Sequence, residues 1–113
     1  MVQNRNKLIE LFVGNISNSI VHDILERSVS EEIVAHKYRK ELITSLGVAK
    51  KYREKINPTN RPLPIRDIAY IRTKIINKVK TELMTRILKG YKNIDLPLID
   101  NLVDKALKDA NIT

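Results

Sequence analysis

The chain has 113 residues with 21 Lys and Arg against 13 Asp and Glu, no cysteine and no tryptophan. This length fits one domain, and the lack of cysteine excludes a disulfide framework, a thiolate nucleophile and a cysteine-based zinc site. No apolar run reaches the ~18 residues that a membrane-spanning helix needs, so we expect a cytoplasmic protein without a membrane role.

A first helix is predicted over residues 5–27, because apolar side chains recur there at steps of three and four. The members of this stripe are Ile9, Val13, Ile16, Ile20 and Ile24. Ser28 and Ser30 follow it and offer N-caps for a second helix over residues 31–56. The turn between the two helices is short, which predicts an antiparallel hairpin.

The second helix has the most regular pattern in the chain. Apolar, aromatic and small residues alternate at steps of three and four through three heptads, as in a coiled-coil seam. Because small residues in a seam let a neighbouring helix approach closely, we predict an interface along it. The residues predicted for this interface are Ala35, Tyr38, Leu42, Ala49 and Tyr52.

Residues 57–64 contain three prolines and are predicted to be a linker, since proline removes a backbone donor and disfavours helix in the residue before it. A third helix is expected over residues 65–89, with Gly90 at its C-terminal cap. A fourth is expected over residues 96–110, with Pro97 in its first turn.

The fold class predicted for residues 1–113 is therefore all-α: one domain, a four-helix bundle built from two helical hairpins that the Pro-rich linker joins. The second helix is about 39 Å long and the fourth only about 21 Å. This mismatch leaves part of the long helices uncovered, so we expect a homo-oligomer, with a dimer favoured.

Positive charge is concentrated in the middle of the chain. Residues 37–92 hold 16 Lys and Arg against 4 Asp and Glu, a net +12, whereas residues 1–36 and 93–113 each carry −2. On helical wheels the lysines of this segment fall on faces opposite the apolar ones. The candidate phosphate-binding residues are Lys37, Lys40, Lys51, Lys55, Arg61, Arg66, Lys74, Lys78, Lys89 and Lys92.

A rigid basic surface attracts the nucleic-acid backbone and releases counterions without reading bases. We therefore predict a small basic helical protein whose central Lys- and Arg-rich hairpin binds nucleic acid through phosphates. Only Tyr70 and Tyr91 are expected to be partly free for stacking, which favours duplex DNA or structured RNA. The alternative is a structural or adaptor subunit without a nucleic-acid role, whose lysines keep it soluble and for which an acidic protein is a suitable partner.

A helix-turn-helix motif is a further alternative, because Leu46-Gly47-Val48 matches the bend of that motif. In that case Lys50, Lys51 and Arg53 would stand at the base-reading end of a recognition helix. The flanks fit poorly, since Ile43 stands where a small residue is needed and Arg53 where an apolar one is needed. The heptad pattern also continues through Gly47, which favours one uninterrupted helix.

Catalysis is not expected, because the chain has two histidines, no cysteine and no catalytic motif. His22 and Glu26 on the first helix could face Glu32 and His36 on the second, as the ligands of a helix-bundle metal site do. Both pairs are spaced by four residues, whereas helix-bundle di-iron sites use Glu and His three apart. We therefore predict no catalytic residue, no metal ligand and no cofactor.

Overall fold

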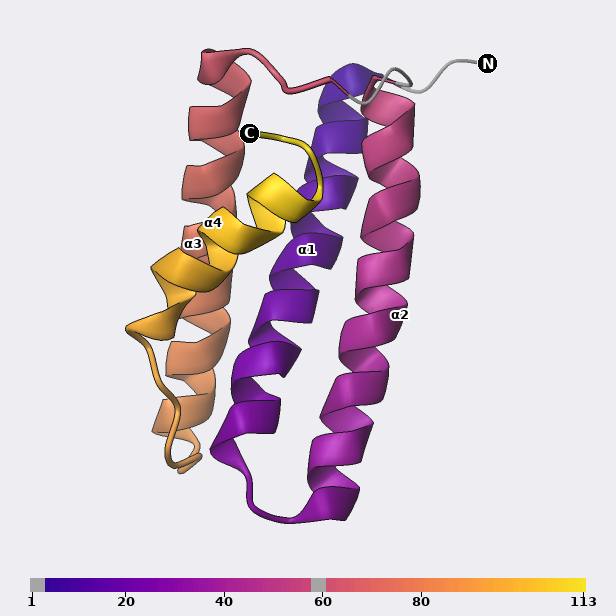
Figure 1. The fold of residues 1–113 in the computed structure, drawn as a ribbon. Coiled ribbons are helices and arrows are strands. Elements are labelled where there is room, and N and C mark those ends of the chain that lie inside the picture. Colours follow the sequence, from indigo (N-terminus) through magenta and orange to yellow (C-terminus); the bar gives the residue numbers. More distant parts are fainter. Residues whose placement is uncertain (1–3, 58–60) are drawn as a thin grey trace.

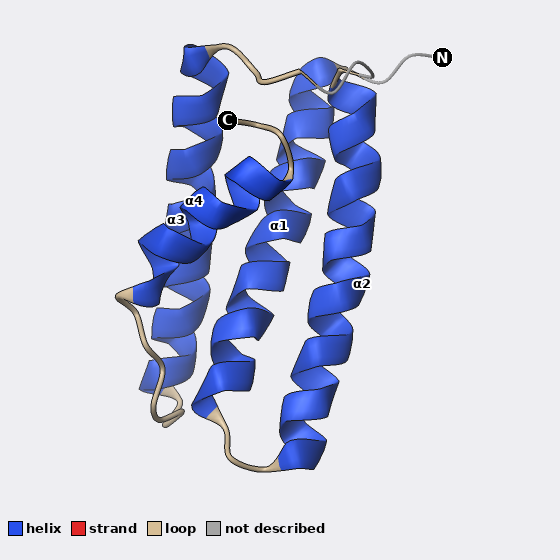
Figure 2. Ribbon diagram, viewed as in Figure 1, coloured by secondary structure: helices blue, strands red, loops and turns tan. Residues whose placement is uncertain are grey.

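The computed structural model describes residues 4–57 and 61–113, and in this part of the chain all regular structure is helical (Figure 2). The four helices are α1 (Arg5–Ser28), α2 (Glu32–Ile56), α3 (Ile65–Leu88) and α4 (Leu98–Asp109). The prediction of an all-α four-helix bundle is confirmed. Residues 58–60 of the expected linker lie outside the described residues; Asn57 and Arg61 to Pro64, on either side of them, are not helical.

Helix α1 is the central element, and α2 and α3 lie on either side of it (Figure 1). Its apolar stripe is buried from Leu8 to Leu25, as the spacing of three and four requires. The stripe is wide because α1 touches three helices, whereas the backbone of α2 approaches that of α1 alone. The central basic segment therefore forms no hairpin of its own, since α1 separates α2 from α3.

The α1–α2 hairpin is the closest helix pair. Ser45 and Ala49 are buried in it, and the Asn18 side-chain amide donates to Ser45 Oγ at 2.5 Å. The predicted serine caps are wrong: Glu31 occupies the N-cap of α2 without a side-chain hydrogen bond. Helix α1 continues through Ser28, whose hydroxyl donates to Leu25 O within the last turn.

Helix α3 runs in the same direction as α1 and presents a buried row of every fourth residue, namely Ile71, Ile75, Val79 and Leu83. It ends at Leu88, and Gly90 follows with φ at 98°, a left-handed conformation that glycine adopts without strain. Before α3, the buried Leu63 donates its backbone N–H to Ile112 O at 3.0 Å. This bond ties the chain on the N-terminal side of α3 to the C-terminal end.

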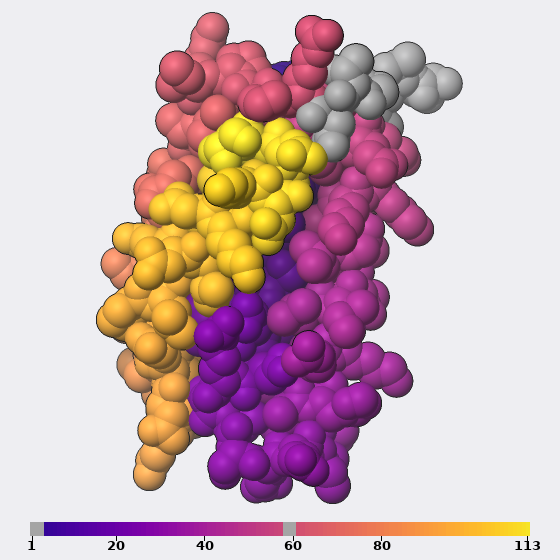
Figure 3. Space-filling model, in the orientation of Figure 1, coloured from indigo at the N-terminus to yellow at the C-terminus, as the bar shows by residue number. Residues whose placement is uncertain are grey.

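Helix α4 crosses α1 and α3 obliquely and buries Ile99, Val103 and Leu107 against them (Figure 1). It covers one face of the molecule only in part, as the space-filling view shows (Figure 3). Apolar side chains outside its reach are exposed, among them Ile33 at 75% and Leu88 at 85%. The molecule measures 43 × 24 × 22 Å along its principal axes.

Candidate nucleic-acid interface

Arginine and lysine have different roles in the described part of the chain. Five arginines form ion pairs with N–O distances of 2.6–3.0 Å: Arg5, Arg27, Arg39, Arg72 and Arg86. Among the described residues no lysine forms an ion pair, and every one of them is exposed. The positive charge that is free for a partner therefore belongs to the lysines and to two exposed arginines, Arg61 and Arg66.

Arg53 is a buried cation, with only 3% of its surface exposed. Its guanidinium donates to Ala110 O at 2.7 Å, to Arg61 O at 2.8 Å and to Asn111 O at 2.7 Å, and also to the Asn57 side chain. Burial lowers the pKa of Arg53 from its usual value. The guanidinium joins the end of α2, Arg61 of the proline linker and the C-terminal end, so it is not available to read a base.

The ten predicted phosphate-binding residues are all exposed, but they do not share one surface. Lys40 and Lys51 point away from α1, because they lie on the side of α2 opposite the buried Ser45 and Ala49. Lys37 lies near the α1–α2 turn, and Lys89 and Lys92 follow the last buried turn of α3. Lys74 and Lys78, in contrast, border an open groove between α1 and α3.

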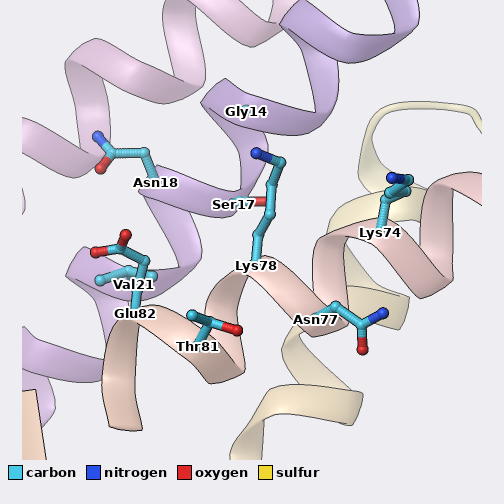
Figure 4. A pocket seen from close by; sticks show the side chains of 9 residues that line it. All are labelled: Gly14, Ser17, Asn18, Val21, Lys74, Asn77, Lys78, Thr81 and Glu82. Atoms are coloured by element: carbon cyan, nitrogen blue, oxygen red, sulfur yellow. The ribbon is translucent and has the colours of Figure 1, made fainter. Parts of the chain in front are cut away.

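This α1–α3 groove has a volume of about 560 Å³. Its floor on α1 consists of small or short side chains, Gly14, Ser17, Asn18 and Val21. The wall on α3 consists of Lys74, Asn77, Lys78, Thr81 and Glu82 (Figure 4). Helix α4 lies on the other side of α1, where it adjoins Phe12, Ile16 and Ile20, so the groove is left open.

Further cations extend the groove toward the N-terminal ends of α1 and α3. Arg66 and Tyr70 precede Lys74 and Lys78 at intervals of four, which places all four side chains in one slanted row along α3. Arg66 and Tyr70 line a second hollow with Asn6 and Glu10 of α1. The groove therefore continues along α3 as a row of mainly basic side chains.

Tyr70 is part of this row and is 45% exposed. Its hydroxyl donates to Glu10 Oε1 at 2.5 Å, and this bond raises the pKa of Tyr70. The Lys74 ammonium lies 5.6 Å from the centre of the Tyr70 ring, within cation–π range. The ring therefore holds a lysine in place in this structure.

Helix α2 adds one lysine on the same side. Asn18 lines the groove and faces Ser45 of α2. Because α1 and α2 are antiparallel, Lys55, ten residues after Ser45, lies level with Leu8, ten residues before Asn18. Its ammonium sits 5.7 Å from the centre of the Tyr52 ring, on the side of α2 that carries Ser45. Lys55 is therefore on the groove side of α2, although it is not among the residues that line the groove.

Lys7 of α1 was missed by the sequence analysis, because it lies in the acidic N-terminal flank. It precedes Gly14 by seven residues, two helical turns, and so lies on the groove side of α1. We define the groove face by the five cations that this register brings to one side: Lys7, Lys55, Arg66, Lys74 and Lys78.

Comparison with protein-family models, with curated proteins and with solved structures finds no significant match. The candidate site therefore rests on the geometry alone. Within the described residues no helix has the length and apolar character needed to cross a membrane.

The four residues weighed for a metal site do not converge. His22 Nδ1 lies 2.7 Å from Asn18 O and its ring is tilted against Tyr38, while Glu26 accepts from Arg39. Glu32 and His36 are exposed at the start of α2. In residues 4–57 and 61–113 no three His, Asp or Glu side chains are grouped as metal ligands.

The helix-turn-helix alternative is wrong for this structure. Helix α2 is continuous through Gly47, which lies in mid-helix and does not have a positive φ. Arg53, placed at the base-reading end of that motif, is buried. Lys50 and Lys51 are exposed, but on a helix that has no preceding partner across a turn at Gly47.

The residues predicted for an interface lie partly inside the protomer. Ala49 is fully buried in the core, and Tyr38 and Tyr52 pack against that core. Ala35 and Leu42 are half-buried. Within one chain this seam meets α1, so its innermost residues are already covered without a second copy.

Proposed function

We propose that this protein binds nucleic acid through backbone phosphates, and that the groove face supplies the contacts. One observation carries the proposal: the cations of this face are exposed, outside ion pairs and on one side of the molecule, and two of them line a polar groove, whereas five arginines are paired and Arg53 is buried. Such an arrangement of free lysines suits phosphate neutralisation, which needs charge but no base contacts.

The polar character of the groove supports the proposal further. Its floor and wall include hydroxyl and amide side chains, those of Ser17, Asn77 and Thr81, which are donors that phosphate oxygens accept from. The Asn18 amide also lines the groove but already donates to Ser45. Glu82 at one end is its only carboxylate lining residue among those described, and Glu82 is paired with Arg86 at 3.0 Å. We further propose a cytoplasmic location and a dimer, in which the exposed apolar end near Ile33 and Leu88 is covered.

The decisive experiment uses charge reversal at matched positions. Replacing Lys74 and Lys78 by Glu should weaken binding to a labelled 30-base-pair duplex by about 30- to 1,000-fold at low salt, since about 1–2 kcal/mol is lost per reversed contact. The control carries Lys80→Glu and Lys108→Glu, which make the same change in net charge with lysines outside the groove face.

The control should bind within about threefold of the parent, because those two lysines do not line the groove. Equal losses in the two variants would mean that only overall charge matters and would refute the groove face. No duplex binding in the parent would favour the alternative, a structural or adaptor subunit that works through exposed apolar residues such as Ile33, Ile43 and Leu88.

A further inference from the structure

One end of the α1–α3 groove combines an empty floor with two ammonium groups outside ion pairs, that of Lys78 and that of Lys74, which lies over the Tyr70 ring. Gly14 forms the floor there, and a Cβ added to it would have no atom within 4 Å outside its own helix turn. The Lys78 side chain extends across the groove toward Gly14 (Figure 4). Lys74 stands one turn before Lys78 on the same wall.

Ser17 lies beneath this end and is the second, independent feature. It is 4% exposed, lines the groove, and its hydroxyl has no hydrogen-bond partner in the described part of the protein. Ser19, on the other side of the same helix and 5% exposed, donates to Ile16 O at 2.7 Å. A buried hydroxyl without a partner is rare in folded proteins and is costly.

The opposite end of the groove is less favourable for an anion, even though Arg86 partly neutralises the carboxylate there. Glu82 lies there next to Val21, and the Asn18 amide nearby already donates to Ser45. A negative ligand is repelled from the Glu82 carboxylate and attracted to the two ammonium groups. The Gly14 end, above Ser17, is therefore the most favourable position in the groove for a negatively charged ligand.

We infer that the Gly14 end of the α1–α3 groove is a binding site, here called the seat, for a single phosphate group of a nucleic-acid backbone. Lys74 and Lys78 neutralise its charge, and the Ser17 hydroxyl donates a hydrogen bond to one of its oxygens. The inference rests on the proposed function for the source of the phosphate. The glycine leaves room for the ligand to approach the α1 backbone.

A blocking variant tests the seat without removing a charge. Gly14→Leu fills the floor with a strong helix former, and Gly47→Leu is the matched control, because Gly47 is also a mid-helix glycine with open space at its Cβ. Both changes should raise the melting temperature. Only Gly14→Leu should weaken binding to the 30-base-pair duplex, by about tenfold, the loss of roughly one charge-assisted contact.

The hydroxyl is tested by Ser17→Ala against Ser19→Ala. Ser17→Ala removes a hydroxyl without a partner, so it should raise the melting temperature and weaken phosphate binding. Ser19→Ala removes a hydroxyl that is hydrogen-bonded, so it should lower the melting temperature and leave phosphate binding unchanged. Binding of inorganic phosphate is followed by NMR on the full chain, where saturable shifts should centre on the amides of Gly14, Ser17 and Asn18. Shifts spread evenly over the lysine-bearing helices would overturn the seat.

The outcomes separate this inference from the proposed function. If Gly14→Leu binds duplex like the parent while Lys74→Glu with Lys78→Glu does not, the seat is wrong and phosphate binding by the groove face stands. The parent protein could fail to bind duplex and single strand while inorganic phosphate still shifts the amide resonances of Gly14 and Ser17. In that case the seat binds a free phosphate compound, and the nucleic-acid function is wrong.

Discussion

Arg53 is the side chain that joins the C-terminal end to the rest of the fold. Its guanidinium donates to three backbone carbonyls, those of Arg61, Ala110 and Asn111. The fork of donors on guanidinium suits several acceptors at once, which a lysine ammonium does not match. The segment on the N-terminal side of α3 and the end of α4 are therefore held by one residue of α2.

Replacing Arg53 by Met should lower the free energy of unfolding by about 3 kcal/mol, because three partly buried hydrogen bonds to backbone carbonyls are lost. Urea unfolding followed by circular dichroism at 222 nm measures the change. Arg72→Met is the control: it removes the exposed pair between Arg72 and Asp104, at 2.8 Å, and should cost about 1 kcal/mol or less. Similar stability of the two variants would show that Arg53 does not anchor the C-terminal end.

A partial signal for Arg53 was present in the sequence. The residue follows Ala49 by four, on the buried side of α2, and an arginine there breaks the apolar pattern. A charged residue at an inward position needs partners, but periodicity does not say which. The partners here are carbonyls of residues 61, 110 and 111, brought close only by the tertiary fold.

Gly47 lowers the stability of helix α2, because glycine is a weak helix former in mid-helix. Gly47 is exposed in mid-helix with no atom within 4 Å of an added Cβ, so Gly47→Ala should stabilise the protein by about 1 kcal/mol. Gly90, with φ at 98°, should respond in the opposite way, losing about 1 kcal/mol on substitution by Ala. Thermal unfolding measures both changes, about 4 °C each in opposite directions.

A decrease in stability for Gly47→Ala would contradict the continuous helix. That result would mean that Gly47 adopts a turn conformation in solution, as a helix-turn-helix motif requires. The two substitutions are chemically identical, so their opposite signs would report on backbone conformation alone.

The elements were predictable from the sequence because each rests on local information. Apolar residues at steps of three and four, three prolines between residues 57 and 64, and a glycine after the third helix mark the helices to within two residues of their observed ends. The caps were less predictable, because the Ser28 hydroxyl can either cap α2 or donate to a carbonyl within α1. In the structure it donates to Leu25 O of α1.

The arrangement of the elements depends on long-range packing and was predicted only in part. The seam of α2 was recognised, but its partner is α1 of the same chain, a choice that periodicity leaves open. The placement of α1 between α2 and α3 decides which lysines share a surface. Lys7 joins them from a flank whose net charge is negative, so a count of charge along the sequence could not find it.

On the scale of the whole molecule, the basic surface is directional. The long axis of 43 Å spans about 13 base pairs of duplex at 3.4 Å each. Lys40 and Lys51 face away from α1 while Lys74 and Lys78 border the groove, so a single duplex cannot contact all ten residues predicted from the sequence. The five cations of the groove face set the expected number of phosphate contacts.

The most direct test of phosphate binding by the groove face is the affinity for a 30-base-pair duplex across a salt series. Log K plotted against log salt concentration should fall with a slope of about −4.5, from five contacts at about 0.9 each. In the variant with Lys74→Glu and Lys78→Glu the slope should shrink by about 2. A slope near zero, or a slope that this variant leaves unchanged, would contradict phosphate binding by the groove face.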